Sequence, residues 1–185
     1  MNLLVMLNIN TALFELVYQS AGYWPVLDWF FIILTSYITY IIIALTVLWS
    51  ICFAPFRTSD MRERMLRFGQ AGELALSLFL TWGVVWITKV LVAHPRPFIS
   101  IPEIVPLVHA SPFESFPSAH AAFAMATAIA VLPFRKHLGH LLIAFAFIVG
   151  MSRLYVGVHY PFDVGVGLLI GFTTAKLVHQ VFKNK

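Results

Sequence analysis

Charge is scarce in this chain. Acidic and basic residues make up only 11% of its 185 residues, which is less than half of the share that soluble domains carry. Hydrophobic residues make up 60%, and the mean hydropathy is +0.86. This composition excludes a soluble protein with an apolar core and indicates an integral membrane protein. The length leaves room for one domain, residues 1–185.

Cysteine and clustered basic residues are also nearly absent. The single cysteine, Cys52, excludes an internal disulfide and lies in an apolar run, where we expect it to be inert packing. The formal net charge of +4 is small, and the basic residues form no patch with interleaved aromatic residues. Binding of nucleic acid therefore has no support in the sequence.

The chain does contain a series of long apolar segments separated by proline and polar residues. About 20 apolar residues suffice for a membrane-spanning helix. The expected spans are 26–53, 72–93, 118–132, 138–155 and 161–182. Two connections stand out, a polar loop at 57–67 and a proline-rich loop at 94–117. The sequence thus predicts an all-α membrane protein, a bundle of about five transmembrane helices.

The N-terminal segment, residues 1–22, leaves two structures open. Its polar residues recur at spacings of three and four, which places them on one helical face: Asn8, Thr11, Glu15 and Gln19. This pattern favours an amphipathic helix that lies in the membrane interface, and a short additional membrane helix is the alternative. No basic residue precedes the apolar stretch, which argues against a signal peptide.

Basic residues in the loops predict the orientation of the bundle. With five spans, nine of them fall on one side: Arg57, Arg62, Arg64, Arg67, Arg135, Lys136, Lys176, Lys183 and Lys185. The other side receives Lys89, Arg96 and Arg153. By the positive-inside rule, the first side and the C-terminus are cytoplasmic. We therefore expect a multi-pass protein of the cell inner membrane, with the three remaining cations at the periplasmic or extracytoplasmic face.

These three cations belong to the first and third of three polar blocks: Lys89–Pro97, Pro117–His120 and Ser152–Asp163. Ionisable groups within apolar segments are costly and usually mark function. A lone arginine at the interface usually snorkels toward headgroups, and a lone histidine is usually structural. The topology, however, brings all three blocks to the outer face, so we expect them to form one site.

The cations of the blocks suit the binding of a phosphate. Arg96 and Arg153 can clamp phosphate oxygens bidentately, and Lys89 adds a point charge. Ser118 can donate its hydroxyl, and its position at a helix start also offers backbone N–H groups to an anion. Fixed cations of this kind stabilise the charge that spreads over the oxygens of a phosphoryl group in transfer.

The histidines and the carboxylate suit attack on that phosphate. His159 and Asp163 are four residues apart, so the carboxylate can hold the ring and leave the far nitrogen free as a nucleophile. His120 can act as the general acid toward the leaving oxygen. With only one carboxylate and no cluster at divalent-metal spacing, we expect no metal and no other cofactor.

The three blocks resemble the signature motifs of the type 2 phosphatidic acid phosphatase superfamily. Those motifs are Lys-x6-Arg-Pro, Pro-Ser-Gly-His and Ser-Arg-x5-His-x3-Asp, and the intervals at residues 89–163 match them without gaps. Ala119 is a departure, because glycine is usual there. The resemblance implies a metal-independent membrane phosphatase that forms a phosphohistidine on His159. Candidates for additional substrate contact are Pro97, Ala119 and His94, although a solvated loop position is the commoner role for a histidine such as His94.

Small bacterial members of this family often act on undecaprenyl diphosphate, and this lipid is the first candidate substrate that the resemblance implies. Hydrolysis would return undecaprenyl phosphate and phosphate. Three alternatives stay open at this point: a phosphatidylglycerophosphate or phosphatidate phosphatase, a lipid phosphotransferase, and a non-enzymatic transporter of anions or lipids. The expected partners are the lipid substrate and the bilayer, and the oligomeric state is not indicated.

Overall fold

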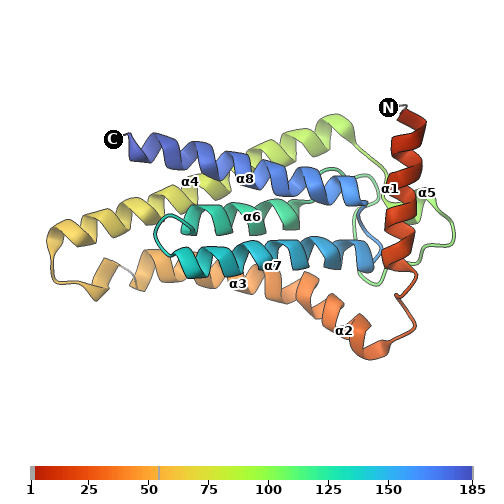
Figure 1. Ribbon diagram of the computed structural model, residues 1–185, viewed down its shortest axis with the longest axis horizontal. Coiled ribbons are helices and arrows are strands. Elements are labelled where there is room, and N and C mark those ends of the chain that lie inside the picture. The colour runs from red at the N-terminus through yellow and green to blue at the C-terminus, as the bar shows by residue number, and fades with distance from the viewer. Residues whose placement is uncertain (1–2, 54, 185) are drawn as a thin grey trace.

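The computed structural model describes residues 3–53 and 55–184, and within these ranges every regular element is helical. The longer helices lie side by side along the long axis of the molecule, whereas α1 (Leu3–Tyr18) lies across one end (Figure 1). The all-α class that the sequence predicts is confirmed. The remaining α-helices are α2 (Pro25–Ile33), α3 (Thr39–Leu48), α4 (Met61–Val92), α5 (Pro97–Ser100), α6 (Ala119–Val131), α7 (Lys136–Tyr155) and α8 (Pro161–Lys183).

Among the described residues, four helical segments are long and apolar enough to cross a membrane: Pro25–Cys52, Met61–Ser100, Lys136–Tyr155 and Pro161–Lys183. Helix α6 is apolar but has only 13 residues. At about 1.5 Å per residue it reaches about 20 Å, less than the ~30 Å thickness of the hydrocarbon core. The membrane class is therefore confirmed, whereas the number of five crossings stays a prediction.

The first span is interrupted by two π-helical turns, η1 (Leu34–Ile38) and η2 (Trp49–Phe53). Pro25 begins the span at the first helical position, where a missing N–H costs no hydrogen bond. The hydroxyl of Thr39 donates to the Leu34 carbonyl oxygen at 2.8 Å, across the wider turn. Such π turns often lie at functional sites.

Helix α4 begins earlier than the expected span 72–93. The polar segment 57–67 was expected to be a loop, and this is wrong from Met61 onward, where the chain is helical. The reason is local, because the Asp60 carboxylate caps the helix by accepting a hydrogen bond from the Arg62 backbone N–H at 2.9 Å. The expected loop 94–117 also contains the short helix α5.

Helix α6 lies at the centre of the bundle, packed against α4, α7 and α8. Small residues allow the close approach of α6 and α8, as is common in membrane helices. A Cβ atom at Gly171 would collide with the Ala122 carbonyl oxygen, and one at Gly167 would collide with that of Ser118. The apolar core around α6 thereby holds the helix starts of α6 and α8 in fixed positions.

Helix α1 covers the end of the bundle at which α8 begins (Figure 1). Its Phe14 is fully buried and packs edge-to-face on Tyr160, with ring centroids 5.6 Å apart. Asn10 accepts a hydrogen bond from the Phe162 backbone N–H at 3.0 Å. The N-terminal helix expected within residues 1–22 is present, and its place relative to the membrane stays a prediction.

Candidate active site

The three polar blocks lie at one end of the bundle, where α4 and α7 end and α6 and α8 begin (Figure 1). Lys89 is in the last turn of α4 and Arg153 in the last turn of α7. Ser118 is the N-cap residue of α6, and Asp163 lies in the first turn of α8. His159 lies between α7 and α8. The Ser118 N–H donates to the Asp163 carbonyl oxygen at 3.0 Å, which joins the second block to the third.

Arg96 joins the first block to the third. Its Nε donates to the Ser111 carbonyl oxygen at 2.6 Å, and its Nη1 donates to the Val158 carbonyl oxygen at 2.7 Å. Nη1 also lies 3.1 Å from Nε2 of His159. The side chain is only 6% exposed, so the backbone holds its guanidinium against the histidine ring.

The carboxylate of Asp163 lies near His159 without forming the hydrogen bond that the sequence led us to expect. The distance from Nδ1 of His159 to Oδ2 of Asp163 is 3.6 Å. Oδ2 instead accepts from the Ser115 hydroxyl at 2.5 Å and from the Tyr160 N–H at 2.9 Å. In this geometry Asp163 caps α8 and stands beside the ring, in ion-pair range of it.

His159 is buried and lies among cations. Burial, followed by the nearby charges of Arg153 and Arg96, holds the pKa of His159 well below its ordinary value. The ring is therefore neutral at physiological pH, the state in which a histidine nitrogen has a lone pair for nucleophilic attack.

Among the expected catalytic and phosphate-binding residues, three buried polar atoms lack a hydrogen-bond partner in the described part of the chain: Nδ1 of His159 and two donors, Oγ of Ser118 and Nε of Arg153. Nη1 of Arg153 does have one, because it donates to the hydroxyl of Thr35 at 2.5 Å. Buried polar groups are rarely left unsatisfied. These two donors belong to residues that the sequence assigned to phosphate binding, and their chemistry fits an anion.

The other expected residues border this cluster. Nζ of Lys89 donates to the Glu114 carbonyl oxygen at 2.5 Å. The ring of His120 packs edge-to-face on Tyr40, with centroids 4.9 Å apart, and is within electrostatic range of Arg153 and His159. All seven expected catalytic and phosphate-binding residues thus belong to one neighbourhood.

The three candidate substrate contacts are buried or half-buried. Pro97 is buried at the start of α5, and Ala119 is half-buried at the start of α6. His94 is half-buried and packs edge-to-face on Tyr160, with centroids 5.8 Å apart. No group of three or more His, Cys, Asp or Glu residues that could hold a metal ion occurs among the described residues.

Sequence reasoning missed three residues of this neighbourhood: Thr35, Tyr40 and Ser115. Ser115 is completely buried. It lies two residues before the Pro117–His120 block, and this closeness in the sequence could have identified it as a candidate site residue. Thr35 is also completely buried, and it comes from the first apolar span. Nothing in the sequence of that span connects it to the three blocks, and only the packing of η1 against α7 does.

Comparisons with known proteins identify the family of this chain. The family model described as the PAP2 superfamily matches residues 70–185. The chain is 30% identical over 170 residues to undecaprenyl-diphosphatase BcrC of Bacillus subtilis (strain 168), which covers 89% of this chain and 81% of that protein. It is 31% identical over 182 residues to YbjG of Escherichia coli (strain K12), whose assignment as an undecaprenyl-diphosphatase is provisional, with 96% and 86% covered.

Solved structures show the same fold. LpxE of Aquifex aeolicus superposes with a TM-score of 0.76 at 30% sequence identity, covering 93% of this chain and 95% of that chain. A transmembrane PAP2-type phosphatidylglycerolphosphate phosphatase from Bacillus subtilis superposes with a TM-score of 0.69 at 22% identity, covering 97% and 87%.

Proposed function

Because this chain belongs to the PAP2 superfamily and is a multi-pass membrane phosphatase, we propose that it hydrolyses undecaprenyl diphosphate to undecaprenyl phosphate and phosphate. The observation that carries the proposal is the buried neutral His159 with Arg96 at 3.1 Å and Arg153 close by. The choice of lipid rests on the two relatives that are similar over most of their length.

In the proposed reaction, the terminal phosphate of the lipid lies between Arg96, Arg153 and Lys89, which neutralise its oxygens. The free hydroxyl of Ser118 and the free Nε of Arg153 donate to the same phosphate. Thr35 holds one end of the Arg153 guanidinium. The remaining N–H groups of the Arg153 guanidinium can then donate to the substrate while the guanidinium stays in place.

Nε2 of His159 attacks the terminal phosphorus. A nitrogen–phosphorus bond forms, the anhydride bond to the bridging oxygen breaks, and undecaprenyl phosphate leaves with a proton from His120. His120 then removes a proton from water, which attacks the phosphohistidine and releases inorganic phosphate. Asp163, fixed by the Ser115 hydroxyl and the Tyr160 N–H, stabilises the positive charge on the His159 ring during the first step.

The site is proposed to face the periplasmic or extracytoplasmic side of the inner membrane, with the C-terminus in the cytoplasm. The positive-inside rule supports this orientation, because the other end of the bundle carries Arg57, Arg62, Arg64, Arg67, Arg135, Lys136 and Lys183. A site at that interface suits a lipid whose headgroup is hydrolysed while its tail stays in the bilayer.

The test is phosphate release by the purified protein in the presence of a chelator, with undecaprenyl diphosphate, phosphatidylglycerophosphate and phosphatidate compared at equal concentration. We expect the highest kcat/KM with undecaprenyl diphosphate. A preference for either glycerolipid would overturn the proposed substrate, and loss of activity that Mg²⁺ restores would overturn the metal-free mechanism.

A further inference from the structure

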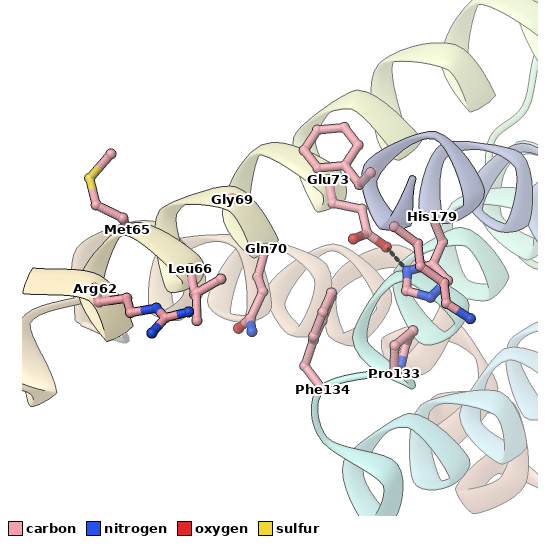
Figure 2. Close-up of a pocket in the computed structure, with 11 residues that line it drawn as sticks. Arg62, Met65, Leu66, Gly69, Gln70, Glu73, Pro133, Phe134 and His179 are labelled. Atoms are coloured by element: carbon pink, nitrogen blue, oxygen red, sulfur yellow. Dashed lines mark hydrogen bonds and ion pairs between the residues drawn. The ribbon is translucent and has the colours of Figure 1, made fainter. Parts of the chain in front are cut away.

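A large cavity lies at the end of the bundle opposite the histidine site. Its volume is about 750 Å³. Figure 2 shows that it is a groove between the first turns of α4 and the last turns of α8, with the α6–α7 turn beside them. Six lining residues matter most for the argument: Arg62, Leu66, Gly69, Glu73, Phe182 and Lys183. None of them belongs to the site described above.

A buried polar pair closes the deep end of the groove. Glu73 is only 2% exposed, and its Oε1 lies 2.8 Å from Nδ1 of His179 (Figure 2). A carboxylate inside a membrane helix is costly unless it is paired. This pair satisfies the carboxylate and joins α4 to α8, so it leaves no unpaired negative charge facing the groove.

The two cations at the groove differ from this pair. Arg62 and Lys183 line it, and neither has an ion-pair partner among the described residues. Neighbouring cations are engaged: Arg67 pairs with Glu63, and the Arg135 guanidinium lies 5.2 Å from the centre of the Trp49 ring. The groove therefore combines apolar walls with an uncompensated positive charge at its rim.

The position of the groove along the membrane normal suits a lipid headgroup. Helix α4 has 32 residues, about 48 Å at ~1.5 Å per residue, whereas the hydrocarbon core is ~30 Å thick. Its first turns therefore extend into the headgroup region. Gly69 widens the groove there, because a Cβ atom at this position would meet nothing within 4 Å.

We propose that this groove binds the headgroup of an anionic phospholipid. Arg62 and Lys183 contact its phosphate, and an acyl chain lies against Leu66 and Phe182. Basic pockets between membrane helices recognise anionic headgroups in this way. The occupant is a resident lipid of the leaflet opposite the histidine site, distinct from the substrate, and it ties the start of α4 to the end of α8. The inference is independent of the proposed substrate.

The test measures thermal unfolding of the detergent-solubilised protein with added phosphatidylglycerol or with phosphatidylcholine of the same acyl chains. We expect phosphatidylglycerol at saturation to raise the Tm by roughly 5–10 °C and phosphatidylcholine to raise it far less. The double variant R62Q/K183Q should lose the difference between the lipids. Arg57→Gln is the matched control, because Arg57 is exposed at the same end and does not line the groove.

A second variant fills the groove without removing charge. Gly69→Leu should abolish the shift by phosphatidylglycerol, whereas Gly83→Leu, at another position on α4 with open space, should retain it. Native mass spectrometry should show bound phosphatidylglycerol on the wild type and on H159A, and not on R62Q/K183Q. Equal shifts by both lipids, or a full phosphatidylglycerol shift in R62Q/K183Q, would overturn the proposal.

Discussion

Nη1 of Arg96 lies 3.1 Å from Nε2 of His159. A guanidinium has only donors and cannot lose its proton under ordinary conditions, so Nε2 is the acceptor of this contact. The ring proton of the neutral histidine then resides on Nδ1, the nitrogen that faces Asp163 at 3.6 Å. The nitrogen with the lone pair is thus the one that faces the arginine. This is the tautomer that nucleophilic attack on an arginine-bound phosphate requires.

Replacing His159 by alanine should abolish turnover, because it removes Nε2, the proposed nucleophile. We expect kcat to fall by at least about 10³-fold, with lipid binding retained. The control is His109→Ala, an exposed histidine in the connection between α5 and α6. When turnover of ³²P-labelled substrate is quenched and the protein is denatured, the wild type should carry acid-labile ³²P-phosphate. The variant should carry none. Normal phosphate release by the variant would contradict the assigned nucleophile.

Thr35→Val should weaken the grip of Arg153 on phosphate, since valine has a similar volume and cannot accept the guanidinium N–H. Loss of one hydrogen bond to a charged group is worth about 1.5–3 kcal/mol, so we expect kcat/KM to fall by roughly 10-fold or more. The control is Thr39→Val in the same span, whose hydroxyl bonds only to the Leu34 carbonyl oxygen. Equal losses in both variants would point to a packing defect and not to Arg153.

Ser115→Ala should release Oδ2 of Asp163 from one of its two donors. We expect kcat to fall by about 10-fold with little change in KM, because Asp163 acts on the ring and not on the substrate. The acid limb of the pH profile of kcat/KM should also move. Ser111→Ala is the control, because Arg96 uses only the backbone carbonyl of Ser111. A rise in KM alone would place Ser115 on the substrate and would be inconsistent with this role.

The pH dependence of activity follows from the direction of the His159 shift. The pKa of His159 lies well below about 6.5 because the ring is buried among cations. The neutral, reactive form therefore persists as the pH falls below 6.5, and the acid limb of kcat/KM should begin below that value. If the acid limb lay at or above pH 6.5 and persisted in variants of each of the other histidines, it would be assigned to His159. That result would contradict the depressed pKa.

The same shift predicts how stability depends on pH. The unfolded chain takes up a proton on His159 as the pH falls through about 6.5, whereas the folded chain does not. The unfolded state then binds more protons, so this residue lowers the free energy of unfolding as the pH falls below about 6.5. Between pH 8 and 5, the Tm of the wild type should drop more than that of H159Q. A smaller drop in the wild type would contradict the sign.

The proposed orientation can be tested with a cysteine at Phe113, which is exposed in the loop beside the site. In a Cys52→Ser background, F113C should react with an impermeant maleimide added outside intact cells or spheroplasts. A cysteine at Arg57, at the opposite end, should react only after permeabilisation. Labelling of F113C from the cytoplasmic side alone would reverse the topology.

The helices of this bundle were largely predictable because hydrophobic runs and proline are local signals. Proline begins α8 at Pro161, and the expected spans 118–132, 138–155 and 161–182 differ from α6, α7 and α8 by at most two residues at either end. The start of α4 was not predictable from hydropathy, because the Asp60 cap extends the helix into a polar segment. The π turn at Leu34–Ile38 also has no signal in an apolar sequence.

The sequence by itself determined the membrane class and the family, and it predicted the residue types of the proposed phosphate site, because residue types at set intervals carry that chemistry. Only the tertiary structure decided which atoms meet. In the packed bundle, Thr35 of the first span accepts a hydrogen bond from Arg153. Oδ2 of Asp163 accepts hydrogen bonds from Ser115 and Tyr160, and Nε2 of His159 faces Arg96. The physical reason is that a hydrogen bond forms only within a narrow range of distances. The partners lie on segments far apart in the sequence, and only the packing of the helices sets the distance between them.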